Sequence, residues 1–238
     1  MQFVWQQILI ALQADIDEGR YGIGDKLPTE AALSIRFGVN RHTVRRALQE
    51  LAHLEVISIR KGSGSTVMPK KIPYTVGKTS RFSSNLVGLH KSGRRRIVRA
   101  ETIRADKTIA EQLALSRQDP VHLLEYIASV EDAPILYSVC YYPAKLLPNF
   151  LQAFQHTLSV TASLMGNGIS SYQRCWSKVR ADRPPPAVAR HLGMLPQSPA
   201  LRIVFLNAQV ETNLPVEYST AWFVGDKIEI NFDHLNNG

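Results

Sequence analysis

The chain has 238 residues, of which 45% are hydrophobic and 20% charged, so it is long enough for one large domain or two ordinary ones. No apolar run approaches the roughly 18 residues that a membrane-spanning helix needs. The apolar N-terminus has no basic n-region and no small-residue cleavage site. We therefore interpret it as a helix of a mature, cytoplasmic protein rather than as a signal peptide.

The net charge of +8 is concentrated in one short segment. Residues 1–68 hold 8 Lys/Arg against 7 Asp/Glu, residues 69–104 hold 10 against 1, and residues 105–238 hold 10 against 12. A basic stretch between two nearly neutral regions is typical of a solvated linker, and beside a DNA-binding motif it also attracts phosphates. Prolines and lysines at its start predict a linker over residues 69–80.

The two cysteines, Cys140 and Cys175, do not form a metal-ligand pattern with any histidine. We expect two buried thiols in a reducing compartment, and neither a metal nor a cofactor.

Three helical patterns and a hairpin pattern precede the predicted linker. The first helix ends near Gly19, the second runs from Thr29 to Gly38, and the third runs from Asn40 to Leu51. Thr29 and Asn40 are suitable N-caps, and Gly38 is suited to end the second helix. Two β-prone runs, residues 56–59 and 66–68, flank a glycine-containing turn. This order predicts a winged helix-turn-helix over residues 1–68.

The third predicted helix combines an apolar stripe with a basic face. Val44, Ala47, Leu48 and Leu51 recur at steps of three and four and predict packing against the other helices. The remaining surface carries Arg41, His42, Arg45, Arg46 and Gln49. Arginine can donate two hydrogen bonds to guanine, and a helix N-terminus suits a phosphate. The alternative interpretation is a solvated basic face.

Three segments resemble the signature of GntR-type regulators: residues 27–30, residues 37–48 and residues 60–65. The resemblance implies DNA contacts on the third helix and at the wing tip, which are Asn40, Arg41, His42, Thr43, Arg45, Arg46, Lys61 and Gly62. One departure is Ala31, where the family often has arginine after the glutamate of the second helix. Operator preference is therefore expected to differ.

The second half mixes strands and helices and contains an internal repeat. Residues 110–142 and residues 189–223 each suggest a short helix followed by two β-prone runs, although chance similarity is an alternative. Between them, residues 144–168 indicate helix and residues 170–181 indicate a long strand. The expected fold class is α/β in the α+β sense, with a winged helix-turn-helix before an antiparallel sheet with helices.

Residues 81–238 resemble the effector-binding and dimerisation domain of the HutC branch of that family, whose fold is chorismate-lyase-like. The resemblance rests on residues 81–86, residues 110–115, Pro134-Ile135, Tyr142-Pro143 and residues 215–219. Residues 81–86 and the Asn40-Arg41-His42-Thr43 run are more narrowly similar to regulators of phosphonate-utilisation operons.

Family members bind small, often phosphorylated or anionic metabolites. The resemblance implies an effector site of Arg81, Phe82, Ser83, Ser84, Tyr126, Ser138, Ser159 and Glu217. Tyr126 and Ala128 stand where the family has two arginines, and Ser138 stands where it has a carboxylate, so sugar-phosphate recognition is in doubt. Arg81 is a possible anion partner, because arginine grips phosphate or phosphonate in two places. It could equally be a surface charge, and Ser83 could instead cap a turn.

Glu217 stands out without the resemblance. Its counterpart in the internal repeat is Leu136, so an acid replaces an apolar residue within a β-prone run. A buried acid needs a partner, and the alternative is an outward-facing side chain.

These patterns and the resemblance together predict a transcriptional regulator that responds to a small anionic metabolite, binds a palindromic operator as a homodimer and is not an enzyme. The resemblance implies a repressor, which is the usual behaviour of the family. The chain contains no G-x-S-x-G, H-E-x-x-H, P-loop or G-x-G-x-x-G motif. The alternative is a DNA-binding regulator whose second half only dimerises, without a small-molecule effector. The sequence does not decide whether the protein represses or activates transcription, and it identifies neither the effector nor the operator sequence.

Overall fold

The computed structural model describes residues 3–69, 71–77, 93–130, 132–195 and 197–232. The chain divides into two compact units, Met1–Lys71 and Ile72–Gly238, and each has its own buried core. Among the described residues, none of the helices is both long and apolar enough to cross a bilayer.

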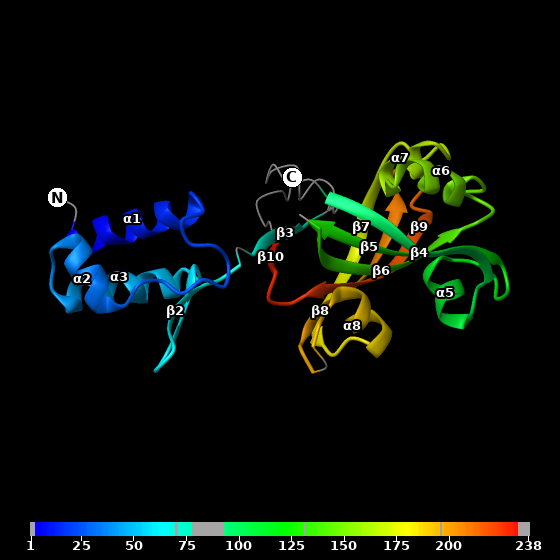
Figure 1. Cartoon of the computed structure of the whole chain (residues 1–238). Coiled ribbons are helices and arrows are strands. Elements are labelled where there is room, and N and C mark those ends of the chain that lie inside the picture. Colours follow the sequence, from blue (N-terminus) through cyan, green and yellow to red (C-terminus); the bar gives the residue numbers. More distant parts are fainter. Residues whose placement is uncertain (1–2, 70, 78–92, 131, 196, 233–238) are drawn as a thin grey trace. The chain divides into compact units, whose positions relative to one another are not determined.

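Three helices form most of the first unit (Figure 1). They are α1 Val4–Asp17, α2 Glu30–Phe37 and α3 Arg41–His53. The predicted caps are confirmed: the side chain of Thr29 accepts a hydrogen bond from Ala32 N, and that of Asn40 accepts one from Thr43 N. Gly38 ends α2 at a positive φ of 64°, a conformation that costs glycine little.

A two-stranded hairpin completes the first unit. Strands β1 Ile57–Arg60 and β2 Gly64–Val67 pair antiparallel. The predicted stripe of α3 faces inward, and its residues are buried with α1, α2 and the hairpin in one core. The winged helix-turn-helix predicted from the sequence is therefore confirmed.

The described residues of the second unit form one six-stranded sheet and one two-stranded sheet. Its strands are β3 Ile72–Val76, β4 Gly93–Arg104, β5 Pro120–Val130, β6 Ala133–Pro143, β7 Tyr172–Asp182, β8 Ala200–Gln209, β9 Pro215–Val224 and β10 Ile228–Phe232. Its described helices are α5 Lys107–Gln112, α6 Phe150–Thr157, α7 Val160–Met165 and α8 Pro186–Leu192.

The large sheet is antiparallel throughout, in the order β4-β5-β6-β9-β8-β7. The two halves of the predicted repeat are present as α5-β5-β6 and α8-β8-β9, and their second strands, β6 and β9, pair at the centre. The helical expectation for residues 144–168 and the strand expectation for residues 170–181 are also confirmed, as α6-α7 and β7.

Helices cover both faces of this sheet (Figure 1). Helices α6 and α7 pack on the face that carries Tyr126, Cys140 and Phe223, and α8 packs on the opposite face with Tyr137 and Trp222. A β-bulge between Arg174 and Trp176 shifts the register of β7. Bulges re-aim side chains, and here Arg174 pairs with Asn207 whereas Trp176 pairs with Leu206, which faces the other way.

The basic segment predicted as a linker is partly structured. Residues 72–76 form β3, which pairs parallel with β10, and Ile72 and Tyr74 are buried. Residues 93–104 form β4, an edge strand of the large sheet. The linker expectation for residues 69–80 is therefore wrong at β3, where lysines and prolines obscure the alternation of buried and exposed positions. Strand β4 lies within the predicted second domain, residues 81–238. Charged side chains on an edge strand also discourage pairing with other chains.

Candidate DNA-binding surface and candidate effector cavity

The N-terminus of α3 holds the first group of predicted DNA contacts. Asn40 caps the helix: its Oδ1 accepts hydrogen bonds from Thr43 N at 2.9 Å and from Thr43 Oγ1 at 3.0 Å. Both side chains are therefore fixed on one another in the free protein. Arg41 and His42 follow directly and are exposed, next to helix N–H groups that suit a phosphate.

Arg45 and Arg46 are exposed on α3, but each has a partner within the first unit. Arg45 makes a two-pronged contact with Glu30, at 2.9 Å from Nε to Oε1 and 2.7 Å from Nη2 to Oε2. Its hydrogen bonds lower the pKa of the Glu30 carboxyl. The Arg46 guanidinium lies 4.6 Å from the ring centroid of Trp5 on α1. DNA contact by Arg45 through the same fork would require it to leave Glu30.

The turn between β1 and β2 holds the predicted wing contacts. Lys61 and Gly62 are exposed at this turn, and Gly62 has a positive φ of 79°. Glycine adopts this conformation at little cost, whereas a side chain there would strain the tip. The predicted wing residues and the N-terminus of α3 thus belong to one compact unit.

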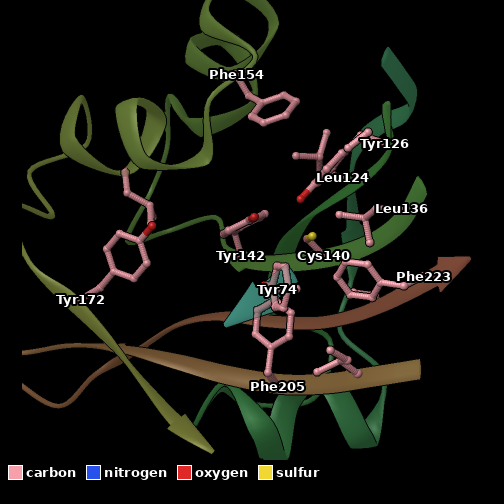
Figure 2. Close-up of a cluster of buried hydrophobic side chains, with 14 of the residues drawn as sticks. Tyr74, Leu124, Tyr126, Leu136, Cys140, Tyr142, Phe154, Tyr172, Phe205 and Phe223 are labelled. Atoms are coloured by element: carbon pink, nitrogen blue, oxygen red, sulfur yellow. The ribbon is translucent and has the colours of Figure 1, made fainter. Parts of the chain in front are cut away.

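The second unit contains a small cavity on the sheet face covered by α6 and α7. It offers about 50 Å³ to the centres of water-sized molecules, enough for a few waters. Its wall comes from β3, β4, β5, β6, β7, β8, β9 and α7, and Figure 2 shows many of the aromatic side chains around it. Its polar lining includes Tyr74, Arg95, Tyr126, Ser138, Thr161, Tyr172, Arg174, Asn207 and Glu217. We call this space the Glu217 cavity.

Glu217 is the buried acid at the centre of this lining, with a relative exposure of 4%. Its Oε1 accepts hydrogen bonds from Tyr142 OH at 3.0 Å and Ser219 Oγ at 2.9 Å, and its Oε2 accepts one from Asn207 Nδ2 at 2.6 Å. The carboxylate is thus held by three donors from β6, β8 and β9. Of the two alternatives from the sequence, the buried position with partners is the observed one.

Asn207 links this acid to a cation. Its Oδ1 accepts a hydrogen bond from Arg174 Nε at 2.7 Å while its amide nitrogen donates to Glu217. Arg174 also donates to Ser177 Oγ, and its guanidinium lies 3.6 Å from the ring centroid of Phe205. The second cation is Arg95 of β4, which donates to the carbonyl of Leu158 at 2.8 Å. Two arginines and one glutamate make the described lining net positive.

Two weakly acidic groups at this wall, the Tyr126 hydroxyl and the Cys140 thiol, stay protonated at neutral pH. Burial raises the pKa of the Cys140 thiol to about 12, and it also raises the pKa of the Tyr126 hydroxyl. The neighbouring Glu217 charge acts in the same direction on both groups. Cys140 is consequently an inert buried thiol, as expected. The expectation of a second buried thiol is wrong, because Cys175 is exposed. Cys175 occupies the bulge of β7, which leaves it outside the core.

Three of the residues expected at the effector site line one cavity: Tyr126, Ser138 and Glu217. Ser159 has another place, because its Oγ caps α7 by accepting from Ala162 N, and the following residues Val160 and Thr161 line the cavity instead. Arg81, Phe82, Ser83 and Ser84 lie outside the described residues.

Sequence reasoning missed several polar residues of the cavity. Arg95, Arg174 and Asn207 come from three different strands, and only the strand order β9-β8-β7 places the last two beside Glu217. Tyr74 lies within residues 69–80, for which the sequence predicts a linker. One available signal was the pair of polar residues, Arg174 and Asn207, at inward positions of β-prone runs, the same kind of anomaly that marked Glu217.

Comparison with known families supports both units. Residues 5–67 match the family model described as bacterial regulatory proteins, gntR family, and residues 89–229 match the UTRA domain. The chain belongs to the UTRA-domain members of the gntR family. It is therefore a transcriptional regulator with a DNA-binding helix-turn-helix and an effector-binding UTRA domain.

Individual relatives agree with this assignment over nearly the whole length. The chain is 29% identical to the uncharacterized HTH-type transcriptional regulator RB1450 of Rhizobium meliloti, over 97% of this chain and 94% of that protein. It is 28% identical to the probable transcriptional regulator PhnF of Escherichia coli, over 97% of this chain and 95% of that protein. The crystal structure of PhnF from Mycobacterium smegmatis has the same fold, with a TM-score of 0.78 at 22% identity, covering 97% of this chain and all of that one.

Proposed function

We propose that this protein is a repressor that binds a palindromic operator as a homodimer and releases it on binding a small phosphonate or phosphate-bearing metabolite in the Glu217 cavity. The observation that carries the ligand class is a cavity wall that holds two arginines, Arg95 and Arg174, of which Arg174 is joined to Glu217 through Asn207. The similarity to proteins named PhnF is in keeping with this class.

The operator half of the proposal follows from the size of the first unit. It holds one recognition helix and one hairpin, enough to read one half-site. Two copies related by a two-fold axis would read a palindrome, because operator symmetry mirrors protein symmetry. The proposed contacts are the exposed side chains at the start of α3 and the tip of the β1-β2 turn.

The ligand half follows from the chemistry of the cavity wall. Arginine holds phosphate or phosphonate oxygens in two places, and Arg95 and Arg174 both line this cavity. Glu217 would accept from a hydroxyl or amine at the other end of the molecule. Tyr126 of β5 and Ser138 of β6 are uncharged, so the anion is expected beside β4 and β7 rather than beside β5 and β6.

Thermal shift of the full chain tests the ligand class. Methylphosphonate, 2-aminoethylphosphonate, inorganic phosphate and glucosamine 6-phosphate serve as probes. A ligand at 100 times its Kd stabilises the native state by about 2.7 kcal/mol, which raises the melting temperature. We expect the phosphonates to raise it in the wild type and in Arg180→Gln, on the exposed half of β7, but not in Arg174→Gln. An equal shift in Arg174→Gln would remove this arginine from the site.

A second candidate function is a regulator whose second unit only dimerises. The small size of the Glu217 cavity favours it, because ligand pockets usually enclose about 300–1,000 Å³. If no probe shifts the melting temperature and no probe changes the affinity for the operator, this second candidate is preferred. A fraction of bound operator that rises more steeply with protein concentration than single-site binding allows, together with a dimer mass from analytical ultracentrifugation, would establish the dimer. Expression from an operator–reporter fusion, with and without the protein, separates repression from activation.

A further inference from the structure

Tyr74 connects the Glu217 cavity to the segment that leads from the DNA-binding unit. It lies on β3, which begins at Ile72, directly after the first unit ends at Lys71. Its ring is buried and packs on Phe223 of β9 with ring centroids 4.9 Å apart (Figure 2). The same side chain lines the cavity. One residue of β3 is thus part of the cavity wall.

The side chain of Tyr74 interacts with Arg174, one of the two cations that line the cavity. Burial raises the pKa of this hydroxyl, and the charge of Arg174 and a hydrogen bond with it oppose the rise. Arg174 is in turn fixed through Asn207 to Glu217. An anion placed on Arg174 would therefore lie next to the Tyr74 hydroxyl.

The cavity must widen to hold a metabolite, since it has room for only a few waters. Most of its wall belongs to the six-stranded sheet, in which β5, β6, β8 and β9 each pair on both sides. Strand β3 pairs only with β10 among the described residues, and a two-stranded pair is the least stable kind of sheet. Strand β3 is therefore the wall that yields most easily.

Strand β10 is held more firmly than β3. It follows β9 after a turn in which Lys227 N donates to Val224 O. At Gly225 an added Cβ would approach the carbonyl oxygen of Pro199 to 2.8 Å, so this turn fits tightly against the start of β8. Displacement of the pair would accordingly separate β3 from β10 rather than move both.

We infer that Tyr74 is the residue through which filling of the Glu217 cavity loosens β3 and so changes the start of the connector to the DNA-binding unit. The inference rests on the proposed function only for the natural occupant of the cavity. The coupling between filling of the cavity and loosening of β3 concerns residues of this chain alone and can be tested without a ligand.

Filling the cavity from the opposite wall provides that test. Ala221 of β9 lines the cavity, so Ala221→Leu places extra atoms in it without altering Tyr74. Thr220→Leu is the matched control, because neighbouring residues of a strand face opposite sides of the sheet. Hydrogen exchange of residues 72–76 in the full chain is the measurement. We expect exchange at least about threefold faster in Ala221→Leu than in the wild type, and unchanged exchange in Thr220→Leu.

Two outcomes overturn the inference. One is a hydrogen-exchange rate of residues 72–76 in Ala221→Leu that equals the rate in the wild type. The other is faster exchange confined to α7, which contributes Val160 and Thr161 to the wall. If Ala221→Leu fails to fold, Ala221→Val applies the same test with a smaller side chain and the same two overturning outcomes.

Operator binding extends the test to the first unit. Fluorescence anisotropy with a duplex selected from random DNA should show weaker binding for Ala221→Leu and unchanged binding for Thr220→Leu. Equal operator affinity in both variants would overturn the coupling even if β3 loosens. If no anionic probe binds, the proposed ligand class is refuted, but the hydrogen-exchange and operator-binding results of these variants do not depend on a ligand and still hold. Failure of the proposed function and failure of this inference are therefore distinguishable.

Discussion

Each unit holds an arginine near a glutamate, but the two arrangements differ in burial and in geometry. Arg45 and Glu30 contact one another directly at the surface of the first unit. In the second unit the half-buried Arg174 is joined to the buried Glu217 through Asn207. Water competes for an exposed pair, which is therefore easily exchanged, whereas a buried acid loses its partners only at high cost.

This difference suits the two units to different tasks. An exposed arginine can leave Glu30 for a DNA group during binding. A buried, fully hydrogen-bonded glutamate holds a fixed geometry, which is what selection among small molecules requires. Substitutions at the buried and at the exposed groups should therefore differ in their cost.

Glu217→Ala should produce the largest loss of stability. It removes the acceptor for Tyr142, Asn207 and Ser219, and buried donors without acceptors are costly. We expect the free energy of unfolding of the second unit to fall by about 3 kcal/mol in urea denaturation. Glu211→Ala, in an exposed turn, should change it by less than about 0.5 kcal/mol. Similar values for both variants would show that burial does not distinguish the two glutamates.

Asp15 tests whether burial, rather than the choice of unit, decides the cost. This acid of α1 is buried and contacts Arg36 and Arg20 at 2.6 and 2.7 Å. Both arginines are partly exposed, so we expect Asp15→Asn to lower the free energy of unfolding of the first unit by a smaller amount, about 2 kcal/mol.

The pH dependence of Asp15 has a definite sign. The hydrogen bond from Arg36 lowers the pKa of Asp15, so its contribution is complete above the ordinary carboxyl pKa and is lost as the pH falls through the lowered value. Acid titration by circular dichroism should show the wild type and Asp15→Asn converging at low pH. A difference in stability that persists unchanged below both pKa values would contradict this account.

Arg45→Ala tests the exposed pair through function. We expect about a tenfold loss of affinity for the operator if Arg45 reads a base, with a smaller loss on random DNA. Equal losses on both, with a shallower salt dependence, would make it a phosphate contact instead. Glu30→Gln should weaken discrimination between the two DNAs by about threefold, because the fork of Arg45 would no longer be oriented. Unchanged discrimination would remove Glu30 from that role.

The smallest effect is expected at another exposed pair of the first unit. Lys71 contacts Glu55, and both side chains are accessible to solvent. Lys71→Ala should change the free energy of unfolding by less than about 0.5 kcal/mol in urea denaturation. A loss of 1 kcal/mol or more would mean that exposure alone does not explain why such pairs are weak here.

The sequence was most informative where local rules suffice. The caps Thr29 and Asn40, the glycine Gly38 and the apolar stripe of α3 act within a few residues, so the helix-turn-helix could be placed from them. Glu217 could be singled out because an acid interrupts an apolar pattern. Tyr126, Ser138 and Glu217 share a cavity, but Ser159 caps a helix. Capping and ligand binding use the same hydroxyl chemistry, and sequence alone does not separate them.

The chain by itself thus determined its two-part organisation, its family and the antiparallel hairpins of the second unit, because periodicity, capping and turn chemistry are local. Only the tertiary structure decided which residues meet around Glu217. Strand order placed Asn207 and Arg174 beside it, a single bulge set the register of Arg174, and pairing with β10 brought Tyr74 into the wall. Such neighbours are far apart along the chain, and their pairing depends on the packing of the whole sheet.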